Sequence, residues 1–262
     1  MNETRPVLRH TGIDRKREDA LRRRGPSRSD PSRTWWHLSA VILAVLAAVA
    51  CGSNSSRAEP APEPEAGAAA PGEADERPVV AVLGDSLTAG LGLPREQAFP
   101  AVLQQLADRS GYQVEVVAAG VSGDTSAGGL RRLDWVLDDR VTVLVVALGG
   151  NDALRGLSAA AMEDNLRAII EGAHAADVAV LLCGMEAPPN FGTPFTAEFR
   201  GVFRVLAQEY GVPFVPFLLD GVAGVPALNQ GDGIHPNAEG ARRVADNVWA
   251  GLEPLLAATL GS

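Results

Sequence analysis

Beyond residue 78, short runs of β-branched and other apolar residues alternate with longer amphipathic runs, and no other feature restricts the possible fold as strongly. The short runs predict strands at 79–83, 114–118, 141–148, 178–183 and 213–216. The longer runs predict helices at 97–111, 126–137, 159–175, 197–210 and 238–260. A succession of this kind is typical of parallel strands that are joined by helices.

The first, third and fourth predicted strands are apolar at nearly every position, so both of their faces should be buried under helices. We therefore expect an α/β fold, in which a single three-layer, doubly wound domain contains a five-stranded parallel sheet in the flavodoxin-like order 2-1-3-4-5. Ligands of such sheets bind beyond the carboxyl ends of the strands. Functional side chains should consequently follow the predicted strands.

Composition divides the 262 residues into three parts. Residues 1–51 form a basic leader, an apolar segment at 38–50 with small residues at its end, and Cys51. Residues 52–77 are mostly Ser, Ala, Pro, Glu and Gly, which bury too little apolar surface to offset the entropy of ordering, so we expect a disordered tether. The remaining residues, 78–262, suffice for one folded domain.

The leader resembles the signal segment of a bacterial lipoprotein, in which Cys51 would be lipidated and would become the mature N-terminus. An uncleaved membrane anchor is the alternative, although the apolar segment is shorter than the ~20 residues that a spanning helix needs. Either interpretation predicts export to the periplasm or the outer cell envelope. The lipoprotein interpretation adds contact with a membrane through the lipid on Cys51.

The charge is unevenly distributed, because residues 1–51 carry a net charge of +5 and the rest of the chain carries −14. An acidic body with only 5% aromatic residues lacks the positive charge and the stacking surface that nucleic-acid binding uses, and this class is excluded. The two cysteines cannot form a disulfide scaffold. Cys183 lies within a predicted strand, where we expect a buried thiol.

Chemically active side chains follow four of the five predicted strands. They belong to the segments Gly84-Asp-Ser-Leu-Thr-Ala-Gly90, Gly120-Val-Ser-Gly-Asp-Thr-Ser126, Gly149-Gly-Asn-Asp152 and Asp232-Gly-Ile-His-Pro236. A single cluster of Gly, Asp and Ser is ordinary turn sequence. Four such clusters, each after a strand of a parallel sheet, should converge on one edge of that sheet and form a site.

Ser86 lies between a predicted strand and a helix start, and a serine hydroxyl needs a base before it can act as a nucleophile. Two of the four histidines lie in the leader and His174 ends an amphipathic helix, so His235 is the candidate base. Asp232 precedes His235 by three residues, a spacing that places both side chains on one face of a helical turn and lets the carboxylate orient the imidazole. The alternative is that this segment is only a turn before the last helix.

Ester hydrolysis also requires hydrogen-bond donors for the oxyanion of the tetrahedral intermediate. The candidates are the backbone N–H groups of Ser86 and Gly123 and the side-chain amide of Asn151. Asn151 could instead be the residue of an Asx-turn. Asp85 and Asp152 adjoin these positions, and we expect them to fix their loops through backbone hydrogen bonds rather than to act as acids.

Over residues 78–262 the sequence resembles the SGNH (GDSL-type) hydrolases, a superfamily defined by four blocks that carry a Ser, a Gly, an Asn and a His in that order. Ser86, Gly123, Asn151 and His235 match the four blocks. The amino-acid sequences of the last three blocks, which contain Gly123, Asn151 and His235, most resemble the bacterial periplasmic branch of multifunctional acyl-CoA thioesterases, lysophospholipases and arylesterases. The resemblance implies a serine esterase with these four residues in its active site.

Other enzyme classes lack their motifs in this sequence. It contains no Gly-x-Ser-x-Gly elbow, no Walker loop, no Gly-x-Gly-x-x-Gly after the first predicted strand, and no His/Cys spacing that suits zinc. We therefore expect neither a cofactor nor a metal ion.

Three functions remain, and the first is a serine esterase that acts on aryl, lipid or thio acyl esters. The segment 185–195, with Pro189, Asn190 and Phe191, favours it, since this segment resembles the mobile substrate-binding loop of the thioesterase branch. Its Phe residues could instead belong to the core or to a hinge. The second function is a carbohydrate O-acetylesterase, and the third is a non-catalytic binding lipoprotein of the cell envelope.

Overall fold

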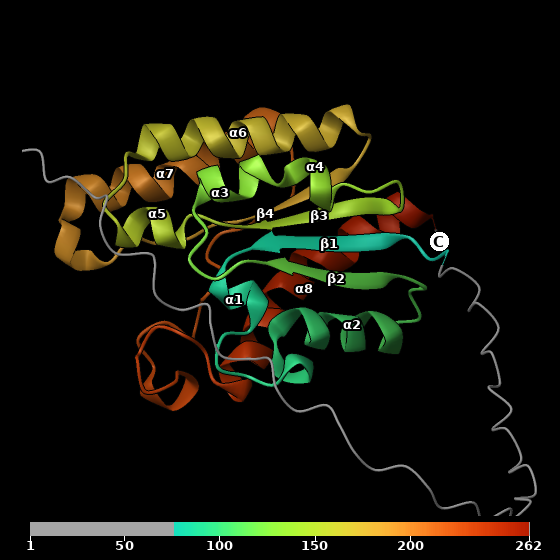
Figure 1. Cartoon of the computed structure of the whole chain (residues 1–262), viewed down its shortest axis with the longest axis horizontal. Coiled ribbons are helices and arrows are strands. Elements are labelled where there is room, and N and C mark those ends of the chain that lie inside the picture. The colour runs from blue at the N-terminus through green and yellow to red at the C-terminus, as the bar shows by residue number, and fades with distance from the viewer. Residues whose placement is uncertain (1–75, 262) are drawn as a thin grey trace, which may run out of the picture. The chain divides into compact units, whose positions relative to one another are not determined.

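A five-stranded parallel sheet runs through residues 76–261, which are the residues that the computed structural model describes (Figure 1). Its strands are β1 (Val79–Gly84), β2 (Glu115–Gly120), β3 (Val141–Ala147), β4 (Ala179–Cys183) and β5 (Phe214–Val215). Their order across the sheet is β2-β1-β3-β4-β5, and every neighbouring pair is parallel. The predicted order is therefore confirmed. The predicted leader, Cys51 and nearly all of the predicted tether lie outside the described residues.

Helices cover both faces of the sheet, which confirms the predicted three-layer α/β fold (Figure 1). One layer contains α2 (Phe99–Arg109) and α8 (Ala238–Leu260), which pack against each other. The other contains α3 (Ser126–Arg131), α6 (Ala159–Ala175) and α7 (Thr193–Tyr210). The short helices are α1 (Ser86–Ala89), α4 (Leu133–Val136) and α5 (Gly150–Leu154), and the 3-10 turns are η1 (Arg95–Gln97), η2 (Pro189–Phe191) and η3 (Pro226–Leu228).

The core lies on both faces of the central strands. All six residues of β1 are buried, and β3 and β4 are buried at every position but one each. Strand β2 is only partly covered because it forms an edge of the sheet. The side chains of Phe199 and Phe203 from α7 complete the core on one face. No helix in the described part of the chain is both long enough and apolar enough to cross a bilayer.

Some predicted boundaries differ from the observed ones. The predicted helix 126–137 is two short helices that meet at Arg132, whose backbone (φ −111°, ψ 10°) leaves the helical conformation. Helix α7 begins four residues earlier than predicted, with Pro194 in its first turn, where a missing N–H costs nothing. Helices α6 and α8 have the predicted bounds.

The strand ends are level with one another, and this alignment positions the site. Gly84 at the end of β1 lies opposite Gly120 of β2 and Ala147 of β3. The loops that follow these three strands consequently begin at the same height on the sheet edge. This register accounts for the predicted convergence of the first three sequence motifs, and the fourth, at 232–236, lies before α8.

Candidate active site

Ser86 is the first residue of α1, directly beyond the end of β1. Asp85 caps this helix, because its Oδ1 accepts a hydrogen bond of 3.0 Å from the backbone N–H of Leu87. A capping side chain in this position fixes the start of the helix and therefore the orientation of the first helical residue. The Ser86 hydroxyl is thereby presented at the edge of the sheet.

Ser86, His235 and Asp232 are brought together as predicted. The Oγ of Ser86 lies 2.9 Å from Nε2 of His235, and Nδ1 of His235 lies 2.6 Å from Oδ2 of Asp232. Because an ionised carboxylate only accepts hydrogen bonds, Nδ1 carries the proton of the neutral imidazole. This tautomer leaves Nε2 free to accept the hydroxyl proton of Ser86.

The Asp232 segment is not the helical turn that its spacing suggested. Gly233 has φ 71°, outside the helical region, and Oδ1 of Asp232 accepts hydrogen bonds from the backbone N–H groups of Ile234 (2.9 Å) and His235 (3.0 Å). The segment is therefore an Asx-type turn that the carboxylate itself closes. One oxygen of Asp232 shapes the loop while the other orients the imidazole.

These contacts lower the pKa of Asp232 well below its ordinary value. The backbone N–H of His235 has the largest effect, followed by the N–H of Ile234 and the imidazole of His235. Each of them is a hydrogen-bond donor that favours the charged carboxylate. The same donors therefore favour Asp232 as the carboxylate that orients the imidazole.

Gly123 lies at the third position of a tight turn after β2. The N–H of Asp124 donates to the carbonyl oxygen of Val121 at 3.0 Å, and Gly123 has φ 83°. A positive φ at this position alone defines a type II turn, which suits glycine. The guanidinium of Arg155 holds the turn from outside, since its Nη2 donates to the carbonyl oxygen of Gly123 at 2.7 Å.

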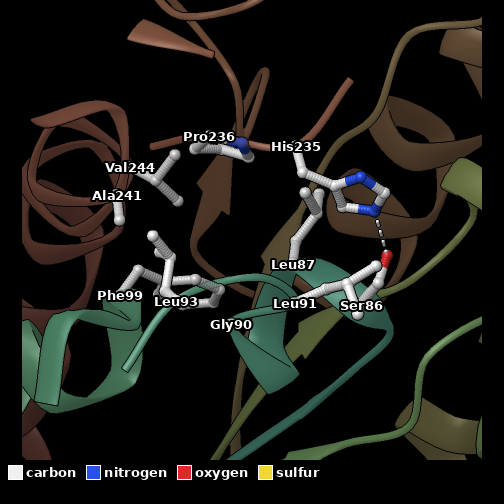
Figure 2. Close-up of a pocket in the computed structure, with 10 residues that line it drawn as sticks. All are labelled: Ser86, Leu87, Gly90, Leu91, Leu93, Phe99, His235, Pro236, Ala241 and Val244. Carbon is white, nitrogen blue, oxygen red and sulfur yellow. Dashed lines mark hydrogen bonds between the residues drawn. The ribbon is translucent and has the colours of Figure 1, made fainter. Parts of the chain in front are cut away.

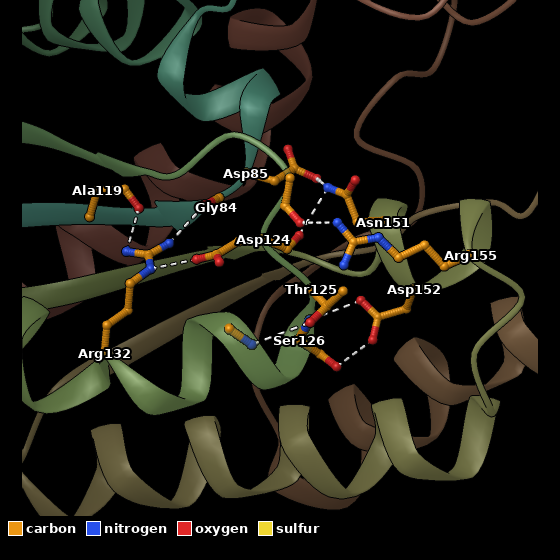
Figure 3. A network of polar contacts seen from close by, with 12 residues as sticks. Gly84, Asp85, Ala119, Asp124, Thr125, Ser126, Arg132, Asn151, Asp152 and Arg155 are labelled. Carbon is orange, nitrogen blue, oxygen red and sulfur yellow. Dashed lines mark hydrogen bonds and ion pairs between the residues drawn. The ribbon is translucent and has the colours of Figure 1, made fainter. Parts of the chain in front are cut away.

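Asn151 lies in the first turn of α5 and joins the loops of β1 and β2 (Figure 3). Its Nδ2 donates to Oδ2 of Asp85 at 3.0 Å and to the main-chain oxygen of Asp124 at 2.9 Å. Reversing the amide would set its oxygen against two acceptors, so the hydrogen-bond network determines its orientation. No backbone N–H within residues 76–261 donates to Oδ1 of Asn151, so the Asx-turn alternative is not the observed arrangement.

Asp85 and Asp152 hold the loops around the site, as expected. Asp85 is 3% exposed, and its burial raises the pKa of its carboxyl group. Asp152 accepts hydrogen bonds from the backbone N–H of Ser126 at 2.8 Å and from its hydroxyl at 2.6 Å (Figure 3). These two carboxyl groups connect the end of β1 to α5 and the start of α3 to α5.

Arg132 is a structural residue of the site that the sequence analysis missed (Figure 3). Its guanidinium donates to the main-chain oxygens of Gly84 and Ala119, each at 2.8 Å, and to Oδ2 of Asp124 at 2.7 Å. It therefore ties the ends of β1 and β2 to the Gly123 turn. Main-chain acceptors have no signature in a sequence, so no pattern pointed to this residue.

An apolar pocket borders the Ser86–His235 pair on the side of α8 (Figure 2). Its wall is built from α1 and the loop after it, from the first residue of α2, from the segment of His235 and from the start of α8. The lining residues are Ser86, Leu87, Gly90, Leu91, Leu93, Phe99, His235, Pro236, Ala241 and Val244. The pocket lies between the segment that carries the serine and the segment that carries the histidine.

The predicted substrate loop lies on the surface after β4. Pro189, Asn190 and Phe191 are exposed, and Phe191 retains 38% of its accessible surface. The ring of Phe191 is 5.4 Å from that of Phe195, whose own ring is 6.0 Å from the buried ring of Phe199. The aromatic row thus extends from the core to solvent and ends at Phe191. Within the described residues, no cluster of His, Cys, Asp and Glu side chains could hold a metal ion.

Comparison with known proteins identifies a family and several relatives. The model of the GDSL-like Lipase/Acylhydrolase family matches residues 82–243. Esterase TesA of Pseudomonas aeruginosa is 43% identical over 176 residues, which are 67% of this chain and 88% of the relative. Thioesterase 1/protease 1/lysophospholipase L1 of Escherichia coli is 38% identical over 176 residues, 67% of this chain and 83% of the relative. The crystal structure of TesA is similar with a TM-score of 0.65 and 42% identity, and the match covers 68% of this chain and 99% of that one.

Proposed function

The chain belongs to the GDSL-like lipase/acylhydrolase family, and from that premise we propose that it hydrolyses carboxylic acyl esters through an acyl-enzyme on Ser86. The observation that carries the proposal is the unbroken path from Ser86 Oγ through His235 to Asp232, with separations of 2.9 and 2.6 Å. A hydroxyl, a neutral imidazole and an ionised carboxylate in this order activate a serine for attack on an ester.

The reaction has two halves that use the same groups. As Ser86 Oγ attacks the carbonyl carbon, His235 Nε2 takes the hydroxyl proton and then gives it to the departing alkoxide or thiolate. A water molecule then attacks the acyl-enzyme, and Nε2 takes a proton from the water and returns it to Ser86 Oγ. The acid is released and the enzyme is regenerated.

Three donors are proposed for the oxyanion: the backbone N–H groups of Ser86 and Gly123 and the Nδ2 of Asn151. Neither backbone N–H donates a hydrogen bond within the described part of the chain, so both are available to a substrate oxygen. The amide of Asn151 already donates to Asp85 and Asp124. It would therefore share or exchange one of these bonds when the oxyanion forms.

The test is to trap the acyl-enzyme. With p-nitrophenyl acetate, a burst of p-nitrophenol should precede steady turnover, and mass spectrometry should place one acetyl group on the peptide that contains Ser86. Turnover with an acetyl group on another residue would contradict the mechanism. A complete lack of turnover on all esters would instead favour a non-catalytic binding lipoprotein.

We propose aryl, lipid or thio esters as the substrates, with Pro189, Asn190 and Phe191 in contact with the acyl group. The exposed ring of Phe191 and the apolar pocket beside Ser86 support an apolar substrate. A panel of acyl esters from about two to sixteen carbons, including an acetylated sugar, would separate this proposal from a carbohydrate O-acetylesterase, which should accept only the acetyl group.

We also propose that the protein is exported and that a lipid on Cys51 anchors it in the cell envelope. The support is the leader pattern alone, because Cys51 lies outside the described residues. Mass spectrometry of the native protein should find a lipidated Cys51 at the mature N-terminus. An unmodified Cys51 that is still attached to the leader would rule out the anchor.

A further inference from the structure

The two central residues of the site come from distant parts of the chain. Ser86 and His235 are 149 positions apart, and they lie on separate segments, one after β1 and the other before α8. Asp232 and His235, in contrast, share one turn. The alignment of base with nucleophile therefore depends on what joins the two segments.

Gln230 forms that join through hydrogen bonds on both sides. Its Nε2 donates to the main-chain oxygen of Leu91 at 2.7 Å, and its backbone N–H donates to the main-chain oxygen of His235 at 2.7 Å. The N–H of Leu91 in turn donates to the main-chain oxygen of Ser86 at 3.0 Å. A continuous path of hydrogen bonds thus runs from the main chain of Ser86 to the main chain of His235.

The chemistry of the carboxamide suits this position. The second proton of Nε2 is donated to the main-chain oxygen of Pro236 at 2.9 Å, so both protons of the amide meet carbonyl oxygens on either side of the gap. A glutamate in the same place would present acceptors to two acceptors. Only a side chain with two donors on one atom satisfies both carbonyl groups.

The neighbouring backbone leaves room for this side chain. Gly92 has φ 79°, and a Cβ placed on it would lie 2.2 Å from Oε1 of Gln230. The carboxamide therefore packs directly against the glycine backbone, at a distance that no other residue type allows. The apolar pocket beside Ser86 and His235 lies between the same two segments (Figure 2).

We infer that Gln230 is a positioning residue, which holds the segment of His235 against the segment of Ser86 and so sets the separation of base and nucleophile. The inference rests on the proposed roles of Ser86 and His235. Displacing a catalytic group by about 1 Å can lower a rate by about 10²-fold. Gln230 is not among the residues that line the pocket beside Ser86, and its effect is transmitted through the main chain of the two segments.

The test compares Gln230→Ala with Gln104→Ala in the full chain. Gln104 is the matched control, because its Nε2 also donates to two acceptors, Asp108 Oδ1 at 2.8 Å and the main-chain oxygen of Val114 at 3.0 Å, but between α2 and β2. With p-nitrophenyl acetate, Gln230→Ala should lower kcat by about 10²-fold with little change in KM. Gln104→Ala should keep the kcat of the wild type, whatever it does to thermal stability. Gln230→Glu should be impaired at least as much as Gln230→Ala.

Two further measurements separate positioning from general damage to the loop. The low-field proton resonance of His235 Nδ1–H should persist in Gln230→Ala, since Asp232 binds His235 directly and Gln230 contributes to their turn only through its main chain, which the substitution keeps. Reaction of Ser86 with diethyl p-nitrophenyl phosphate, which transfers the diethylphosphoryl group to Oγ and releases p-nitrophenol, reports the attack step alone and should slow by about 10²-fold. Loss of the resonance, or an unchanged phosphorylation rate, would overturn the inference.

Gly92→Ala provides an independent approach to the same contact, because the new methyl group would displace the Gln230 carboxamide. If both substitutions break one bridge, the double variant should be no slower than the slower single variant. Effects on kcat that multiply would overturn the inference, as would a folded Gln230→Ala with wild-type kcat. Substantial turnover by folded Ser86→Ala would contradict the proposed function itself, and this outcome is distinct from any result with Gln230.

Discussion

The Nδ2 of Asn151 lies 3.0 Å from Oδ2 of Asp85, a carboxyl group that is almost completely buried. Because the same nitrogen also donates to the main chain of Asp124, the loops of β1, β2 and β3 meet at one atom. The residue proposed to stabilise the oxyanion is consequently also a link in the framework of the site. Experiments on Asn151 must therefore measure turnover and stability together.

Asn151→Ala should lower kcat and kcat/KM by about 10²–10³ with little change in KM, since the amide would act only on charge that forms in the transition state. It should also lower the free energy of unfolding by about 1–3 kcal/mol, because Asp85 loses a donor. Ser126→Ala is the matched control: it removes a donor from buried Asp152 and should affect stability alone. Normal kcat in folded Asn151→Ala would leave Asn151 with a framework role only.

Ser86→Ala and His235→Ala should each nearly abolish ester hydrolysis while thermal unfolding stays close to that of the wild type, since neither side chain belongs to the buried core. The two residues act as one unit, so the double variant should be no slower than either single variant. Initial rates with p-nitrophenyl acetate and melting curves test this expectation. Substantial turnover by either folded variant would contradict the serine mechanism.

Asp232→Asn should lower kcat by about 10⁴, because an amide facing Nδ1 favours the imidazole tautomer that cannot accept the proton of Ser86. The Asn side chain still offers Oδ1 to the N–H groups of Ile234 and His235, so the turn should persist. Steady-state kinetics and circular dichroism would check both statements. A loss of less than tenfold would show that Asp232 does not set the tautomer.

The lowered pKa of Asp232 also predicts the sign of a pH effect on stability. Its carboxylate is favoured in the folded chain, so it stabilises the fold at pH values above the ordinary Asp pKa of about 3.9, and this contribution is lost as the pH falls toward the lowered folded value. The difference in unfolding free energy between wild type and Asp232→Asn should therefore shrink below pH ~4. Denaturant titrations between pH 2 and 7 would measure it, and a difference that grows toward low pH would contradict the assignment.

Gly123→Ala should lower kcat because alanine disfavours φ 83° and drives the turn toward type I, which rotates the Gly123 N–H away from the substrate. The added methyl group itself has room, since its nearest contact is the Arg155 guanidinium at 3.5 Å. Gly111→Ala is the control: φ is 85° and nothing lies within 4 Å of its Cβ position, so it carries the same strain far from the site. Equal kcat in both variants would remove the Gly123 N–H from the oxyanion donors.

The strand order and the position of the site could be predicted because they depend on patterns of side chains. Unbroken apolar runs marked β1, β3 and β4, and Ser86, Gly123, Asn151 and His235 each followed a strand in the printed sequence. Burial on both faces and the level ends of β1, β2 and β3 place the loops of Ser86, Gly123 and Asn151 at one sheet edge, and His235 reaches Ser86 from the segment before α8. Each of these inferences depends on the types of side chain in the sequence, which determine burial and the position of turns.

The supporting contacts could not be predicted, because their acceptors are main-chain oxygens. Arg132 bonds to Gly84 and Ala119, and Gln230 bonds to Leu91 and Pro236 through carbonyl groups that every residue possesses. Only the folded backbone shows which carbonyl groups lie within reach.

The single turn that holds Asp232 and His235 reduces the geometric problem of building this site. Where nucleophile, base and orienting acid come from three separate segments, three bodies must be aligned, and an error in any pair disables the centre. Here Asp232 and His235 lie in one turn, which fixes their relative positions. Only this pair therefore has to be aligned with Ser86. A designed scaffold that contains this turn would already have an imidazole oriented by a carboxylate. Only the position of the serine relative to this pair would remain to be designed.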